Sequence, residues 1–156
     1  MLKKKLLLVT IILFLSSCGY TPMWKGINSN DVNFTIQIVE SKGNDNLNRL
    51  IIANLKKYRI SENEKNFLIS VQSKFNKIPI SKDKTGKILE NNINITVNFK
   101  LNLGGEEKIF SYQETTYLKT SDNMIDEKTQ ERNFIQNLTS TICEKFISEL
   151  VKYSDT

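Results

Sequence analysis

INITVNFKLNL, residues 93–103, is the longest strict alternation of apolar and polar side chains in the chain. Successive side chains of a β-strand point to opposite faces, so this period of two predicts a strand with one apolar and one polar face. The polar face carries Asn94, Thr96, Asn98, Lys100 and Asn102. The apolar face has to be covered, which predicts a sheet packed on one side.

Three further strands surround this segment in the sequence. Gly104-Gly105 predicts a tight turn, so residues 93–103 form a hairpin with residues 108–118, in which Glu114 is a charge on the apolar face. Residues 32–39 alternate from Val32 and predict the first strand. Residues 67–76 alternate in the same way, and we expect Pro79 to end that second strand.

Two segments have the three- and four-residue spacing of amphipathic helices. The first follows Gly43-Asn44-Asp45, ends near Arg59 and presents the apolar residues Leu47, Leu50, Ile51, Leu55 and Tyr58. The second begins between Ser121 and Glu127 and continues to about Tyr153. Its apolar stripe is Phe134, Ile135, Leu138, Ile142, Phe146, Ile147 and Leu150, and its exposed positions are Glu127, Glu131, Gln136, Lys145 and Glu149.

The element order is therefore strand, helix, strand, strand, strand, helix. With one apolar face per strand and one apolar stripe per helix, it predicts an α+β fold in which two helices pack on one face of a four-stranded, mostly antiparallel sheet. The other face of this sheet is polar. From the sequence, it either faces water or meets a polar partner.

The amino terminus has the order of an export signal. Lys3, Lys4 and Lys5 precede an apolar run over residues 6–15, which is shorter than the roughly 20 residues that span a bilayer. The run ends in Leu15-Ser16-Ser17-Cys18, which resembles the lipobox of bacterial lipoproteins. The resemblance implies that the signal is removed and that Cys18 carries lipid. Gly19 after the cysteine implies sorting to the outer membrane.

The predicted organisation is a signal peptide over residues 1–17, a lipidated tether over 18–31 and a single domain over 32–153. Loss of the signal removes three lysines and lowers the net charge from +5 to +2, so no nucleic-acid partner is indicated. The chain has no histidine and no carboxylate pair in an apolar setting. We therefore expect no enzyme site, no metal and no cofactor. Cys143 is expected to be a small buried apolar residue.

A second resemblance starts at the lipobox. Cys18-Gly19-Tyr20-Thr21-Pro22-Met23, a short aromatic tether and the predicted element order are similar to the lipopolysaccharide-assembly lipoprotein LptE family. The resemblance implies a lipoprotein anchored at the periplasmic side of the outer membrane. It also implies that the domain plugs the LptD β-barrel, assists assembly of that barrel and helps deliver lipopolysaccharide to the cell surface.

The candidate ligand-binding residues are Lys82, Lys84 and Lys87, in the polar segment 81–87. Lysine ammonium groups on an exposed turn can contact the phosphates and acidic sugars of lipopolysaccharide. A plain solvated loop would have the same composition.

Two other functions fit a small exported α/β domain. One is a different lipoprotein adaptor, such as a secretin pilot or a transporter accessory subunit, which would bind a peptide in a groove. The other is a carrier of a hydrophobic ligand, which would need an apolar pocket between helices and sheet. Close packing of the phenylalanines in that layer would count against the carrier. These residues are Phe34, Phe67, Phe75, Phe99, Phe134 and Phe146.

Overall fold

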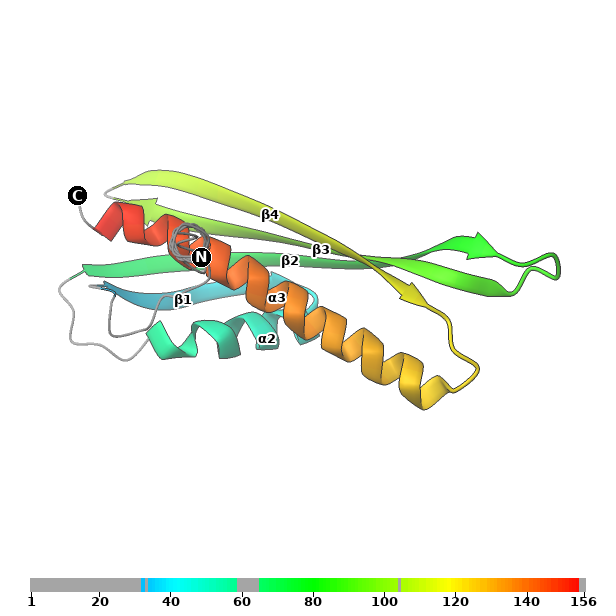
Figure 1. Cartoon of the computed structure of the whole chain (residues 1–156). Helices are drawn as coiled ribbons and strands as arrows, with labels where there is room; N and C mark the ends of the chain where they lie inside the picture. Colours follow the sequence, from blue (N-terminus) through cyan, green and yellow to red (C-terminus); the bar gives the residue numbers. More distant parts are fainter. Residues whose placement is uncertain (1–31, 33, 59–64, 104, 155–156) are drawn as a thin grey trace, which may run out of the picture.

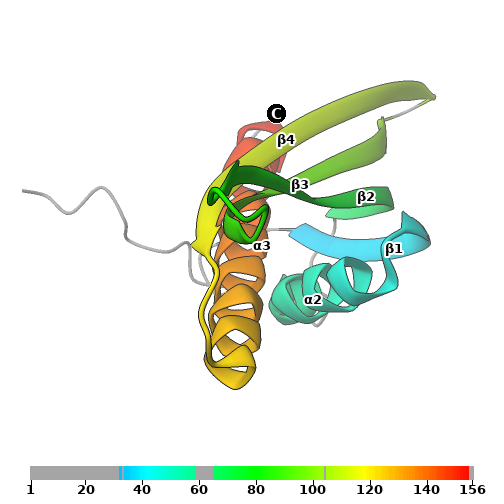
Figure 2. The same cartoon turned by 90° about the vertical axis from the view of Figure 1, so that its right-hand side faces the viewer.

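The computed structural model describes residues 32, 34–58, 65–103 and 105–154. Cys18, the signal and the tether lie outside the described residues. The described chain forms a sheet with strand order β1-β2-β3-β4, and α2 and α3 both cover the same face of it (Figure 1, Figure 2). β1 and β2 are parallel, and the other neighbouring pairs are antiparallel. The predicted α+β class, the element order and the single covered face are confirmed.

β3, Ile88–Leu103, lies between β2, Lys65–Lys82, and β4, Glu106–Lys119. The alternation predicted for residues 93–103 is confirmed, because one side of β3 is fully buried under the helices while the residues between remain partly exposed. The buried positions are Ile93, Ile95, Val97, Phe99 and Leu101. β3 starts five residues before the predicted first residue, Ile93. β4 was predicted over residues 108–118 and extends two residues further at its start and one at its end.

β1, Phe34–Gly43, leads into the first helix through a tight contact with β2. The backbone N–H of Asn44 donates to the carbonyl oxygen of Ser73 at 3.2 Å. The Asn44 side chain in turn caps α2, Asp45–Leu55, by accepting from the N–H of Leu47 at 3.0 Å. A cap satisfies one of the free N–H groups of the first helical turn, so this helix begins where the sequence predicted.

α2 is followed by a short 3-10 helix, Lys56–Tyr58, which ends close to the predicted boundary. The apolar stripe of the two helices packs on β1 and β2. Its fully or nearly buried members are Leu47, Ile51, Leu55 and Tyr58.

α3, Met124–Ser154, runs diagonally across the covered face of the sheet, in front of the strands in Figure 1. It starts within the predicted range. Phe146 is fully buried and stacks on Phe99 with ring centroids 3.9 Å apart and an interplanar angle of 5°. Two positions of the predicted stripe, Phe134 and Leu138, are only half-buried, although Leu138 packs against the core. Thr139 is buried instead, and its hydroxyl donates to the carbonyl oxygen of Ile135 at 2.6 Å, which satisfies its polar atom inside the core.

The predicted end of the second strand is also wrong. β2 continues through Pro79, which pairs with Asn91, and ends at Lys82. β1 reaches only to the level of Ser73, so among the described residues no strand pairs with the other edge of this part of β2. Proline is tolerated on an edge, where the missing N–H need not cost a hydrogen bond, and the register is irregular directly after it.

Charged residues tie α3 to the sheet. Glu114, which contradicted the alternation of its strand, accepts a hydrogen bond from Lys145. Glu131 and Glu127 were expected to be exposed, but they are half-buried and contact Lys77 of β2 at 2.8 and 3.3 Å. Burial lowers the pKa of Lys77, yet these two carboxylates hold that pKa above its ordinary value overall.

Cys143 is buried in α3, as predicted. Burial raises the pKa of its thiol to about 12, so the thiol stays protonated and unreactive at neutral pH. None of the helices in the described ranges combines the length and apolar character needed to cross a membrane.

Candidate functional site

The β2–β3 hairpin projects beyond the rest of the fold as an arm, which we define as residues 78–90 (Figure 1). β4 ends opposite Glu90, so the end of the arm is a two-stranded ribbon. Three large aliphatic side chains on it are exposed: Ile78 by 55%, Ile80 by 48% and Leu89 by 45%. Isolated two-stranded ribbons are marginally stable in water, and exposed apolar side chains at their end are typical of a contact surface.

Asp83 organises the turn at the end of the arm. Its Oδ1 accepts three hydrogen bonds, from the N–H and hydroxyl of Thr85 at 2.8 and 2.7 Å and from the N–H of Lys87 at 2.9 Å. The hydrogen bond from the Thr85 hydroxyl is the main reason why the pKa of Asp83 is lowered. Gly86 has a φ of 87°, a conformation that suits glycine.

The structure brings the three predicted lysines together at this turn. Lys82 is the last residue of β2, which corrects the prediction that it lies in a loop, and Lys84 lies in the turn itself. Lys87 is already paired, because its Nζ lies 2.6 Å from Oδ1 of Asp122. This pairing raises the pKa of Lys87 and lowers that of Asp122. Lys82 and Lys84 therefore provide the more available cations.

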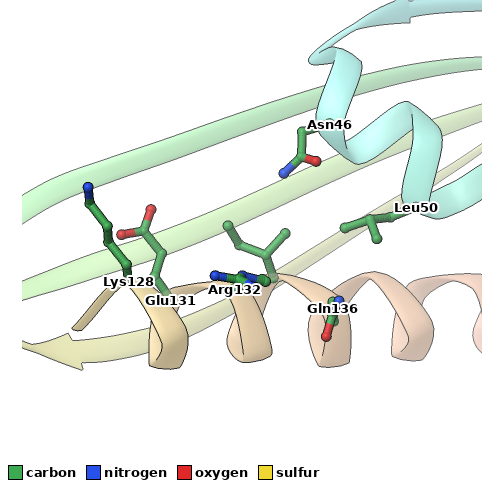
Figure 3. Close-up of a pocket in the computed structure, with 7 residues that line it drawn as sticks. Asn46, Leu50, Lys128, Glu131, Arg132 and Gln136 are labelled. Atoms are coloured by element: carbon green, nitrogen blue, oxygen red, sulfur yellow. The ribbon is translucent and has the colours of Figure 1, made fainter. Parts of the chain in front are cut away.

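A groove of about 440 Å³ separates α2 from the first half of α3. Asn46 and Leu50 of α2 face Arg132 and Gln136 of α3 across it (Figure 3). Lys128, Glu131 and Ile135 complete the lining. The sequence did not predict this groove, because the groove lies between two helices that are far apart in the chain.

The sheet face opposite the helices, which we term the outer sheet face, is polar as predicted. Its centre is made of four cross-strand rows, each with one residue from β2, β3 and β4. The rows are Gln72, Asn98 and Ser111; Lys74, Thr96 and Gln113; Asn76, Asn94 and Thr115; and Ile78, Asn92 and Tyr117. Among these positions, Lys74 is the one charged side chain.

The layer between sheet and helices is filled by aromatic side chains. Phe34 and Phe67 have ring centroids 5.3 Å apart, and Phe110 lies edge-on to Phe146 at 5.8 Å. Four of the six phenylalanines expected in this layer are buried, whereas Phe75 and Phe134 are half-buried. This packing occupies the space in which a hydrophobic ligand would have to bind.

Comparison with known proteins gives similarity of fold. No family model and no curated protein matches the chain. Among solved structures, rare lipoprotein B from Shewanella oneidensis is similar with a TM-score of 0.56 and 12% sequence identity, over 75% of this chain and 96% of that one. Lipoprotein B from Nitrosomonas europaea is similar with a TM-score of 0.55 and 11% identity, over 80% of this chain and 89% of that one. The described domain thus has the fold of these bacterial lipoproteins.

Proposed function

We propose that this protein is an LptE-type outer-membrane lipoprotein, attached through lipid on Cys18, that plugs the LptD β-barrel and assists lipopolysaccharide transport. The observation that carries the proposal is the fold shared with two lipoproteins, in a chain whose segment 15–18 resembles a lipobox and precedes that fold. The polar outer sheet face adds support, because the lumen of a large outer-membrane barrel is polar.

A peptide-binding lipoprotein adaptor is the second candidate. The groove between α2 and α3 favours it, because Leu50 and Ile135 offer apolar contacts beside the cations Lys128 and Arg132. The filled aromatic layer disfavours the carrier of a hydrophobic ligand.

The test combines palmitate labelling with purification of the tagged full chain from membranes. We expect wild type to be labelled and to recover a large outer-membrane β-barrel. Cys18→Ala should lose the label completely, since the acylated thiol is gone. Cys143→Ala is the matched control and should keep the label, because Cys143 is buried.

Each result bears on a different part of the proposal. Label retained on Cys18→Ala would refute the lipoprotein assignment. Recovery of only a secretin or an inner-membrane transporter would contradict the barrel-plug function and support the peptide-binding adaptor.

Within this function, Lys82, Lys84 and Lys87 contact the phosphates of lipopolysaccharide. Changing all three to serine should weaken lipopolysaccharide binding about tenfold at low salt, since exposed charge contacts contribute ~0.2–1 kcal/mol each. The loss should shrink at high salt because salt screens exposed charges. Binding can be measured by titration of labelled lipopolysaccharide.

The control for this variant changes Lys56, Lys57 and Lys152 to serine, which removes the same charge from exposed positions. Equal binding by both variants would mean that the turn is simply solvated.

A further inference from the structure

Charge is distributed unevenly between the two sides of the molecule. A quarter of all residues are charged, yet the positions that β2, β3 and β4 contribute to the four central rows of the outer sheet face hold Lys74 alone. At the β1 edge of this face, Lys42 lies in register with Gln72 and pairs with Glu40 at 2.7 Å. The next row contains Lys100, and that side chain pairs with Glu107 at 2.6 Å. The helical layer, in contrast, exposes Asp45, Arg49, Asp126, Lys128, Arg132, Glu144 and Lys145.

An uncharged polar face is inexpensive to bury. Removing an ion from water costs several kcal/mol unless it finds a partner, whereas amides and hydroxyls can exchange water for hydrogen bonds to another polar surface. Depletion of charge together with exposed tyrosine is the composition that distinguishes the centre of a protein interface from ordinary surface. The outer sheet face has few charges and an exposed tyrosine, whereas the helical layer exposes many charges.

Two exposed apolar side chains mark one end of this face. Tyr117 of β4 and Ile78 of β2 flank Asn92 in one row, and they are exposed by 59% and 55%. Tyrosine is enriched among residues that dominate binding energy, so this pair has the chemistry of an anchor. The same row begins the arm, which joins the anchor to the exposed Ile80 and Leu89.

The side chains beside the anchor are already held in place. Asn94 donates its amide to the hydroxyl of Thr115 at 2.9 Å, and the hydroxyl of Thr96 donates to the Asn94 oxygen at 3.3 Å. Such preorganisation reduces the entropy lost when these groups meet a partner.

We propose that the outer sheet face, with Tyr117 and Ile78 as its anchor, is the surface that contacts the inner wall of the partner β-barrel. This inference rests on the proposed function and names the surface that serves it. A closed barrel offers no free strand edge, so the contact is made by side chains of the face and not by strand addition. The polar wall and this face of low charge are complementary, because amides and hydroxyls on the two surfaces can exchange hydrogen bonds and Lys74 is the one charge of the central rows on β2, β3 and β4.

The test compares matched substitutions on the two sides of the molecule in the full acylated chain. Gln113→Arg adds a second cation to the central row that already holds Lys74, so that two like charges would have to be desolvated together, and Gln130→Arg places a cation on the exposed surface of α3. Recovery of the barrel should fall at least tenfold for Gln113→Arg and change less than twofold for Gln130→Arg. Both positions are exposed, and thermal melting of each purified variant checks that the fold is kept.

A second pair tests the anchor. Tyr117→Ala should reduce recovery at least fivefold, whereas Ile125→Ala removes an even more exposed apolar side chain from the start of α3 and should have no effect. Normal recovery by Gln113→Arg and Tyr117→Ala would overturn the inference while leaving the proposed function standing. Loss confined to Gln130→Arg would assign the interface to the helical layer. Failure of wild type to recover any barrel would overturn the proposed function itself.

Discussion

Gly43→Ala is expected to lose about 2–6 kcal/mol of unfolding free energy, the sum of left-handed backbone strain and a steric clash. Gly43 has a φ of 102°, and a Cβ there would lie 1.9 Å from the carbonyl oxygen of Ser73. That oxygen belongs to the backbone of β2, which is paired on both sides at this level and cannot move away. Urea unfolding followed by circular dichroism measures the loss.

Gly86→Ala is the matched control for this variant. Its φ of 87° is similarly unfavourable for alanine, but no atom lies within 4 Å of the added Cβ. The control should therefore show the strain alone, about 1–3 kcal/mol. If both variants lose the same amount, the contact between Gly43 and Ser73 is not the reason for glycine at this position.

Phe146→Ala is the second large effect, with an expected loss of about 3–5 kcal/mol, as for other buried phenylalanines. Its ring is fully buried, stacks on Phe99 and meets the edges of Phe110 and Tyr112 at 5.8 and 6.5 Å. Truncation leaves a cavity that rigid rings on three sides cannot refill. For a domain with a total stability of roughly 5–15 kcal/mol, the loss would shift the urea midpoint strongly.

Phe134→Ala, on the same helix, separates this packing effect from a general effect of losing an aromatic ring. Phe134 is half-buried, so its truncation should cost clearly less. A loss equal to that of Phe146→Ala would contradict the conclusion that Phe146, and not Phe134, is a central residue of the core between α3 and the sheet.

Local patterns predicted the elements well because each one has a single apolar face. The alternation of β3 and the Asn44 cap before α2 could be predicted because both depend only on local backbone geometry: side chains alternate along a strand, and the first turn of a helix has free N–H groups. The prediction of Pro79 as a strand end was wrong for a tertiary reason. It depended on where β1 stops, and no residue near Pro79 carries that information.

In the candidate sites, too, local features could be predicted and long-range contacts could not. The lysines of the turn are neighbours in sequence, so their grouping could be predicted. The pairing of Lys87 with Asp122 and the contact of Lys77 with Glu131 join positions 35 and 54 residues apart. The strand order and the parallel pairing of β1 could not be predicted either, because every strand has the same type of amphipathic face.

The strand order follows the order of the chain, so each strand that is added finds its neighbour already present. No strand has to insert between two that are already hydrogen-bonded, and the pairings of β2, β3 and β4 join segments close in sequence. Such local topologies fold comparatively fast. A polypeptide that emerges amino end first from a narrow pore can therefore build this sheet progressively from one edge, without reopening any part that has formed.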